Sequence, residues 1–438
     1  MPALEDLAAV ARGILAAAVS AAHPGAMTAA LLGRALDDDP LPPRRPHWII
    51  ALGKAAPAMA REALAQCALR DLNVKGGIIV GTSSDDVPAD GLVRVAGDHP
   101  VPGAASAAAA DRLAALCDEV TDGCMAIVLV SGGTSSLIGA PVAGITPEDL
   151  ARLHLLLLGS GLDIGRMNAV RKRFSRWGAG RLAAALAPAE VQSVLLSDVP
   201  GNDPAAIGSG PCAPDPTTAT DVEKILRDAG IAHRIPLSVA SHLGAVRAGS
   251  LPETPKAGSP VFAHVRRPVI GGNRGALAAA ARQATLLGIR RVLLDERPLV
   301  GDAADAGRAL ARAALDAEPG TCIVRGGETT IALPAVHGVG GRNQQLALAA
   351  ARFLADGGSG APRVVLLAAG TDGRDGPTDT AGAIVTNSTW EAIRSAGLDP
   401  EGHLERCDAY PALAAAGALV RTAATGTNVA DIVIALRA

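Results

Sequence analysis

Aromatic residues are scarce in this sequence: Phe, Trp and Tyr together make up 2% of its 438 residues. Proteins that bind single-stranded nucleic acid need aromatic side chains on which bases stack, so this scarcity argues against such a partner. The formal net charge of -3 also lacks the positive excess that a nucleic-acid backbone attracts. We therefore expect no nucleic acid as a partner, and a core built from Ala, Leu, Val and Ile.

The six cysteines are scattered along the chain, and none forms a CxxC pair. This pattern indicates thiols in a reducing compartment, and neither a disulfide framework nor a zinc site. No uninterrupted apolar run approaches the ~20 residues of a membrane span. The apolar segment Leu7–Ala22 follows an acidic start without Lys or Arg, which does not suit a secretory signal. We expect an amphipathic helix there, in a cytoplasmic protein with no membrane partner.

The commonest nucleotide-binding signatures are also missing. There is no GxxxxGK[ST] loop, and the protein-kinase signature set is absent. No GxGxxG follows a strand and opens a helix with an acidic residue downstream, and no HExxH occurs. A Walker-type cradle, a dinucleotide fold and a histidine-based metal centre are therefore without support.

The sequence does contain a regular alternation of short apolar runs and longer helical patterns. Continuous apolar runs flanked by helices indicate strands buried on both faces, which is typical of parallel sheets in an α/β protein. Such strands are predicted over His47–Lys54, Gly76–Ser83, Cys124–Gly133, Val191–Asp198, Arg290–Glu296, Thr321–Glu328 and Arg363–Asp372, with a closing strand within Thr425–Leu436.

The length of the chain predicts two domains. Residues 246–268 are rich in Gly, Pro and Ser and show no helical period, which is typical of a linker. We therefore expect an α/β fold with two domains, residues 1–245 and 269–438. Each should hold a mostly parallel sheet flanked by helices.

Polar, glycine-rich turns follow several predicted strands, at the sheet edge where open α/β folds bind ligands. The turn "SGGTSS" offers backbone N–H groups and hydroxyls to an anion, with Ser131, Gly132, Gly133 and Ser135 as candidate contacts. Lys54 ends the first strand and can pair with a phosphate as a point charge. The alternatives are a serine-capped tight turn and a solvated lysine.

Two further segments bring cations to helices. Asn168, Arg171 and Lys172 lie within about one helical turn and can grip a carboxylate or phosphate, although a basic solvent face is the alternative. Arg342 and Asn343 follow a glycine turn and open a predicted helix. Because a cation at a helix N-terminus opposes the macrodipole, Arg342 indicates an anionic ligand held by its planar fork.

Carboxylates and small polar side chains follow the other strands. Mg²⁺ takes one or two carboxylates together with the phosphates of a substrate, and a carboxylate can also deprotonate an attacking hydroxyl. The pattern therefore predicts Mg²⁺-assisted phosphoryl transfer, with ordinary Asp-Gly turns as the alternative. The candidates are Asp372 and Asp375 for metal, Asp198 for catalysis, Ser197, Glu328 and Asn428 for binding, and Asp379 for loop structure.

Taken in order, these segments resemble the glycerate 2-kinase family that carries a C-terminal MOFRL domain. The resemblance covers nearly the whole chain and departs from the family pattern at Thr134, usually Gly, and at Gln345, often Glu. It rests on "ALGKAA", "GDHPVP", "VSGGTSSL", "MNAVRKRFSRWGAGRLA", "LLSDVPGNDPAAIGSGP", "RGGETT", "GGRNQQLALAAA", "AAGTDGRDGPTDTAGAIV" and "TGTNVADIVIAL".

The resemblance implies a Rossmann-like N-terminal domain and a smaller MOFRL domain, with the active site in the cleft between them. It implies ATP-dependent phosphorylation of D-glycerate at the 2-hydroxyl, giving 2-phosphoglycerate, with Mg²⁺ as cofactor. Within it, Lys54 and Arg342 are the expected catalytic residues. A homodimer is a possible assembly. Hydroxypyruvate reductase, a label some members carry, and a non-catalytic sugar-acid binding protein remain alternatives.

Overall fold

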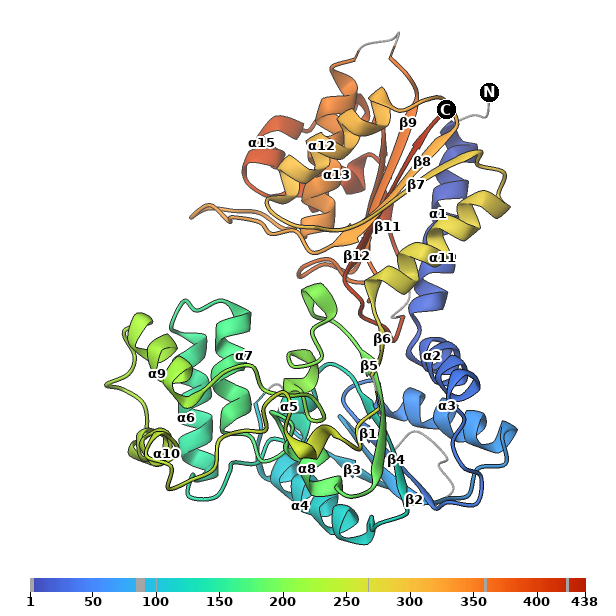
Figure 1. The fold of residues 1–438 in the computed structure, drawn as a ribbon. Coiled ribbons are helices and arrows are strands. Elements are labelled where there is room, and N and C mark those ends of the chain that lie inside the picture. The colour runs from blue at the N-terminus through green and yellow to red at the C-terminus, as the bar shows by residue number, and fades with distance from the viewer. Residues whose placement is uncertain (1–3, 84–90, 100, 267, 358–360, 423–424) are drawn as a thin grey trace. The chain divides into compact units, whose positions relative to one another are not determined.

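The computed structural model describes residues 4–83, 91–99, 101–266, 268–357, 361–422 and 425–438. Within it the chain divides into two units (Figure 1). One consists of Thr28–Gly271 and is called the 28–271 unit. The other consists of Gly272–Ala438 and the described part of Met1–Met27, and is called the C-terminal unit.

The sheet of the 28–271 unit is wholly parallel, with strand order β3-β2-β1-β4-β5-β6. This is the doubly wound, Rossmann-like order, and the expected fold class is confirmed for this unit. The strand order reverses between β1 and β4, and ligands of such folds bind beyond the strand ends at that point. The strands are β1 (His47–Leu52), β2 (Val74–Gly81), β3 (Leu92–Ala96), β4 (Met125–Val130), β5 (Glu190–Leu196) and β6 (Val269–Gly271).

Helices of the 28–271 unit form two apolar cores. The first packs on the sheet and includes buried side chains of α4 (Ala104–Glu119), the short α5 (Thr134–Leu137) and α8 (Arg181–Leu186). Helix α3 (Ala56–Leu69) packs against β1 and β2. The second is purely helical, because its buried side chains come from α6, α7, α9, α10 and the turns beside them. These helices are α6 (Pro147–Leu158), α7 (Ile164–Arg173), α9 (Ala219–Asp228) and α10 (Leu237–Arg247).

The sheet of the C-terminal unit is mixed, with order β11-β10-β9-β12-β8-β7. Among its described strands, only β7 and β8 are parallel neighbours, and the other four pairs are antiparallel. The prediction of a mostly parallel sheet is therefore wrong here. Burial on both faces produces continuous apolar runs in parallel and antiparallel strands alike, so the runs alone do not indicate the direction of a strand. The strands are β7 (Arg291–Leu299), β8 (Thr321–Gly327), β9 (Val364–Gly370), β10 (Gly382–Thr386), β11 (Leu419–Val420) and β12 (Asp431–Arg437).

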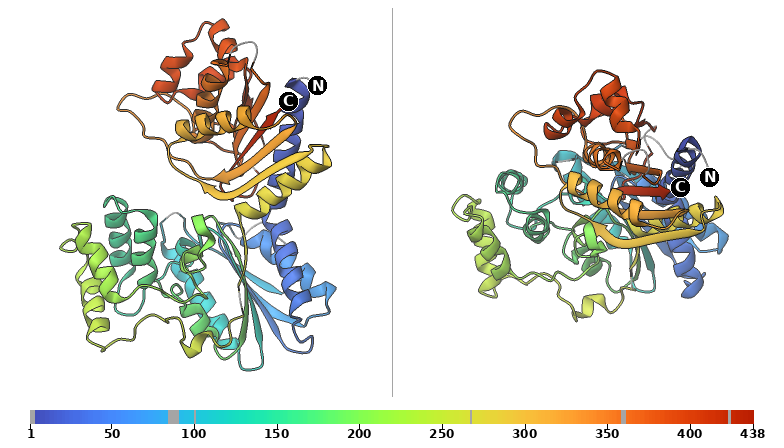
Figure 2. Two further views of the ribbon diagram at one scale, coloured as in Figure 1. Left: turned by 45° about the horizontal axis from the view of Figure 1, so that its top comes forward. Right: turned by 90° about the horizontal axis from the view of Figure 1, so that it is seen from above.

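Helices cover both faces of this sheet, as Figure 2 also shows. The pair α1 (Leu4–Ala22) and α11 (Asn273–Leu286) packs on one face, and α12 (Ala303–Asp316) and α13 (Arg342–Ala355) pack together on the other. The small helices α14 (Thr389–Ser395), α15 (Pro400–Glu405) and α16 (Ala409–Ala415) flank α13.

The N-terminal helix α1 belongs to the C-terminal unit and not to the unit that follows it in sequence. Its apolar side buries Ala11, Ile14 and Ala18 completely against α11 and the sheet. The expected helix over Leu7–Ala22 is confirmed. Among the described helices none is by itself both long and apolar enough to cross a membrane. Asp6–Ala22 and Pro24–Asp38 meet that test only together, as a pair bent by 61°.

The expected linker 246–268 is bound to the 28–271 unit along its described length. Glu253 pairs with the buried Arg173 at 2.5 Å, and the Val191 amide donates to the His264 carbonyl at 2.9 Å. The compact units therefore differ from the expected division at residues 1–27 and 246–271. The chain passes between the units within α2 (Pro24–Asp38) and at Gly271–Gly272.

Candidate functional site

Two loops meet beyond the carboxyl ends of β1 and β4, at the point where the strand order reverses. Gly53 has φ of +118°, and a Cβ on it would collide with the Ser131 hydroxyl, so only glycine allows this crossing. The Lys54 amide donates to the Gly132 carbonyl at 2.9 Å, and the Ala55 amide donates to Ser131 Oγ at 3.1 Å. Ser131 is buried and therefore joins the two loops as a structural link.

Three polar side chains converge on the glycines of the Ser131–Ser136 loop. A Cβ on Gly133, which has φ of +87°, would lie 3.1 Å from Lys54 Cγ and 3.3 Å from His99 Cδ2. A Cβ on Gly132 would overlap the Asp198 carboxylate. The missing Cβ atoms thus let a cation, an imidazole and a carboxylate reach one backbone turn, and all three side chains are exposed.

The imidazole of His99 was missed as a site residue, because its "GDHPVP" turn indicates capping as readily as function. Burial lowers the pKa of His99, and the nearby Lys54 charge lowers it further. His99 is therefore neutral near pH 7 and can donate or accept a hydrogen bond beside Lys54.

Two serine candidates of this unit have internal partners. Ser197 is buried, and its hydroxyl donates to the Val199 carbonyl at 3.1 Å and accepts from the Val199 amide at 3.2 Å. Ser135 shares a 2.6 Å hydrogen bond with Ser209. The departure at Thr134 is accommodated, because its buried hydroxyl donates to the Ser131 carbonyl at 2.7 Å and fixes the turn.

The three candidates on α7 have different surroundings. Lys172 is 5% exposed and forms a 2.9 Å ion pair with the fully buried Asp215 carboxylate, so this charge is satisfied inside the protein. Arg171 is half-buried, burial lowers its pKa, and its Nε has no partner among the described residues. Asn168 is partly exposed on the same helix. The structure thus leaves Arg171 and Asn168 as candidates, whereas Lys172 is a structural cation.

In the C-terminal unit, Arg342 opens α13 and is clamped between two carboxylates. Its Nε lies 2.6 Å from Asp431 Oδ2 and its Nη2 lies 3.1 Å from Asp431 Oδ1, while Nη1 donates to Glu328. Burial alone would lower the pKa of Arg342, but the pairing with Asp431 and Glu328 outweighs it and raises the pKa. The bidentate edge expected to hold an anion is therefore occupied by Asp431, and a ligand can reach only the Nη end.

Asp431 is the second site residue that the sequence reading missed. It is 4% exposed and begins β12, the strand between β8 and β9. Burial raises its pKa, and the ion pair with Arg342 opposes that effect. A carboxylate directly before the apolar run "IVIAL" is the sequence signal that points to such a residue, since a buried charge needs a partner.

Asp375 and Asn343 are hydrogen-bonded to each other at the start of α13. The Asp375 carboxylate accepts the Asn343 amide at 3.0 Å, the Asn343 side chain at 3.2 Å and the Gln344 amide at 2.8 Å. It is 2% exposed, and burial raises its pKa to about 6 against the opposing effect of these bonds. This carboxylate therefore satisfies orphan N–H groups of a helix N-terminus, as expected for a cap.

The described carboxylates differ in how well they suit the expected Mg²⁺ ion. Among the described residues no three His, Cys, Asp or Glu side chains group as metal ligands. Asp375 does not fit, because its oxygens already accept three N–H donors. Asp372 fits better, because it is partly exposed and, among the described residues, only its Oδ1 accepts a hydrogen bond, from the Arg374 amide at 2.9 Å. It flanks Gly370 together with Asp431. One such carboxylate suits a Mg²⁺ ion held mainly by nucleotide phosphates.

The remaining candidates are exposed. Glu328 keeps one oxygen free of the Arg342 contact, and Asn428 accepts the Ala430 amide at 3.3 Å within its own turn. Asp379 accepts a 2.8 Å hydrogen bond from the Tyr410 hydroxyl, which agrees with its expected part in the loop.

Comparison with known proteins gives the chain its family. A model for a domain of unknown function, DUF4147, matches residues 10–244, and the MOFRL family model matches residues 321–431. The glycerate 2-kinase of Pyrococcus horikoshii is 36% identical over 89% of this chain and 87% of its own length. The D-glycerate 2-kinase of Thermotoga maritima is 35% identical over 89% and 90%.

Two further matches complete the comparison. A protein of Agrobacterium vitis named putative hydroxypyruvate reductase is 37% identical over 89% of this chain and 87% of its own length. The crystal structure of glycerate kinase from Thermotoga maritima superposes with a TM-score of 0.87 at 32% identity, covering 99% of this chain and all of that one. This chain therefore belongs to the glycerate 2-kinase family that combines a DUF4147 domain with a MOFRL domain.

Proposed function

We propose that this enzyme transfers the γ-phosphoryl group of ATP to the 2-hydroxyl of D-glycerate, giving 2-phosphoglycerate and ADP. The observation that carries the proposal is the convergence of Lys54 and Asp198 on the glycines of the Ser131–Ser136 loop. A cation and a carboxylate at one backbone turn, where a doubly wound sheet binds ligands, are what phosphoryl transfer to an alcohol requires.

The residues divide the chemistry between them. Asp198 accepts the proton of the 2-hydroxyl as its oxygen attacks the γ-phosphorus, and ADP leaves with the electrons of the broken P–O bond. Lys54 neutralises charge that develops on the transferred group. Arg342 contacts an anion with its Nη end, either the glycerate carboxylate or a phosphate. Bound Mg²⁺ would supply charge neutralisation at the nucleotide phosphates, and Asp372 is the carboxylate that would hold it.

We further propose that Lys54 and Arg342, which belong to different units, act on the same substrate. Residues that act as one catalytic assembly have strongly non-additive effects. The variant Lys54→Ala/Arg342→Ala should therefore lose little more activity than the worse single variant. Multiplicative losses would show that the two residues serve separate sites.

The activity is tested by incubating the enzyme with D-glycerate, ATP and Mg²⁺ and identifying the product by ³¹P NMR. The proposal requires 2-phosphoglycerate, formed in step with ADP. Formation of 3-phosphoglycerate alone would contradict the assigned hydroxyl. Assaying EDTA-washed enzyme first without Mg²⁺ and then with Mg²⁺ added back tests the metal requirement directly.

The two alternative functions are tested with the same preparation. Oxidation of NADH with hydroxypyruvate would favour the reductase, the name that one relative carries. Binding of D-glycerate by calorimetry without any turnover would favour a sugar-acid binding protein.

All six cysteines are free, which agrees with the proposed cytoplasmic location.

A further inference from the structure

Strand β7 leaves a long open edge on the sheet of the C-terminal unit. It has nine residues and, among the described strands, pairs only with β8. The opposite edge strand, β11, has two residues. Proteins usually protect open edges by making them short or by placing proline and charges on them, because a free row of N–H and C=O groups pairs with other chains. The one proline of β7, Pro298, lies near its end and leaves Arg291–Glu296 able to pair.

The sequence along this edge is charge-complementary to itself. Arg290 and Arg291 precede the apolar residues Val292–Leu294, and Asp295 and Glu296 follow them. An antiparallel copy centred on Leu293 would place each arginine opposite an acidic residue. We propose that β7 pairs with β7 of a second copy of this chain about a two-fold axis at Leu293, giving a homodimer with one continuous sheet.

The register follows from the geometry of antiparallel pairing. With Leu293 opposite Leu293 of the partner, Arg291 faces Asp295, Arg290 faces Glu296, and Val292 faces Leu294. Opposite residues then share a face of the sheet, as the strand period of two demands. Cross-strand pairs of opposite charge or of apolar side chains each stabilise such a ladder by roughly 0.2–1 kcal/mol.

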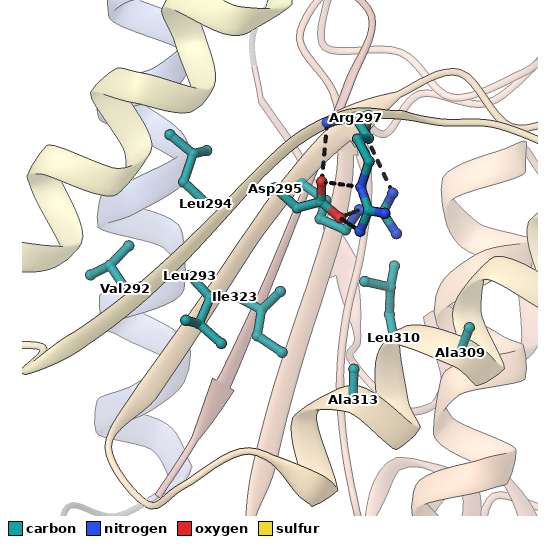
Figure 3. Close-up of a pocket in the computed structure, with 10 residues that line it drawn as sticks. Val292, Leu293, Leu294, Asp295, Arg297, Ala309, Leu310, Ala313 and Ile323 are labelled. Atoms are coloured by element: carbon teal, nitrogen blue, oxygen red, sulfur yellow. Dashed lines mark hydrogen bonds and ion pairs between the residues drawn. The ribbon is translucent and has the colours of Figure 1, made fainter.

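The surface around Leu293 suits this contact. Leu293 is 47% exposed, although it lies in the middle of the strand. It borders a groove of about 560 Å³ whose apolar wall includes Leu310, Ala313 and Ile323. Figure 3 shows Leu293 on the α12 side of the sheet, whereas Val292 and Leu294 point to the other side. The partner's Leu293 would lie beside this groove and gain apolar contact there.

The charges of β7 have local partners in the single chain. Asp295 pairs with Arg297 and Arg325, Arg291 with Glu318, and Glu296 with Arg274, and most of these side chains are well exposed. Dimerisation therefore adds opposite charges to an exposed network and buries no unpaired ion. A two-strand contact is small beside the ~1,600 Å² of a standard interface, so we expect a reversible dimer.

Charge reversal tests the register. Arg290→Glu alone would face Glu296 of the partner, and Glu296→Arg alone would face Arg290. Each variant should dissociate about tenfold more readily than the unaltered protein in sedimentation equilibrium. An equimolar mixture of the two variants restores both attractive pairs, so it should recover the dimer as a heterodimer.

Cysteine cross-linking tests the centre. In the proposed register the two Cα atoms at position 293 lie about 4.5 or 5.5 Å apart, within disulfide range. Leu293→Cys should therefore form an intermolecular disulfide on mild oxidation. Arg297→Cys is the control: its two copies would lie about 27 Å apart, eight residues at ~3.4 Å each, and should not cross-link.

Leu293→Lys places two cations face to face and should give monomers. Leu237→Lys, at a leucine of the 28–271 unit that is 82% exposed against 47% for Leu293, should leave the dimer unchanged. A monomer at every concentration across a roughly hundredfold range would overturn the proposal. A dimer that survives Leu293→Lys, or a mixture of charge variants that stays monomeric, would overturn it as well.

Discussion

Asp431 holds the guanidinium of Arg342 by its Nε–Nη2 edge, with N–O distances of 2.6 and 3.1 Å. The Asp431 carboxylate is buried, and Arg342 is the first residue of helix α13. The pair therefore presents the Nη end of Arg342 in one direction, and Asp431 is a positioning residue for the proposed site.

Asp431→Asn should lower kcat/KM of the proposed kinase by about 10- to 100-fold, because the Arg342 cation stays in the protein but is no longer held in its orientation. Glu328→Gln is the matched comparison, since Glu328 is 44% exposed and contacts one nitrogen of Arg342. On a logarithmic scale, its loss of kcat/KM should be less than half the loss in Asp431→Asn. Steady-state kinetics of folded variants decides this. Equal losses of kcat/KM in the two variants would show that Asp431 positions Arg342 no more than Glu328 does.

Arg342→Lys should be nearly as damaging as Arg342→Ala. A lysine ammonium has no planar edge for Asp431 and cannot also present a second donor toward an anion. The measurement is kcat/KM for D-glycerate and ATP in both variants. Recovery of near-normal activity by lysine would show that a point charge suffices at this position.

Lys54→Ala should lower kcat by ~100-fold or more, because a pre-placed cation beside a developing charge is worth several kcal/mol. Lys75→Ala is the control, since Lys75 is an exposed lysine of the neighbouring strand β2. Circular dichroism should show the same fold in both. A fall of less than threefold in Lys54→Ala would remove this residue from the catalytic set.

Asp372→Asn should raise the Mg²⁺ concentration needed for half-maximal activity, whereas Asp375→Asn should mainly lower the melting temperature. The first carboxylate has an oxygen free for a metal, and the second accepts the N–H groups at the start of α13. Replacing a helix cap costs about 1 kcal/mol. Activity against Mg²⁺ and thermal melting of both variants separates the roles; an unchanged Mg²⁺ dependence in Asp372→Asn would rule it out as a ligand.

Stability should fall as the pH drops from about 6.5 to about 4, because of His154. Burial, and then the charge of Arg171, lower the pKa of His154 from 6.5 to about 4. Between these values the unfolded chain binds the proton and the folded one does not, so acid favours unfolding, by at most about 3 kcal/mol. Urea unfolding at several pH values should show that the free energy of unfolding changes less with pH in His154→Gln than in the unaltered protein. The same pH dependence in both proteins would contradict the assignment.

The sequence was most informative where a feature depends on neighbours in the chain. The glycine turn after β4 and the lysine after β1 lie where the apolar runs end, so both could be placed beforehand. The internal partners of Lys172 and Asp375, which are Asp215 and the start of α13, lie 43 and more than 30 residues away in the chain. Local sequence patterns do not reveal such pairings.

Strand direction was also invisible in the sequence. Apolar runs such as those of β9 and β12 predict burial correctly, and both are almost fully buried. The direction in which a strand enters the sheet depends on the length and path of the connections between strands. No local sequence pattern in the C-terminal unit indicates the path of those connections.

The membership of α1 in the C-terminal unit has a consequence for biosynthesis. This helix leaves the ribosome before the 28–271 unit, but the elements it packs against, α11, β9 and β12, are translated only after that whole unit. Strand β12 follows the other strands in the chain and still lies between β8 and β9. The 28–271 unit can therefore fold while translation continues, whereas α1 and the apolar faces of the later sheet stay exposed until β12 emerges. A cell that makes this protein has to protect those surfaces from aggregation during that interval.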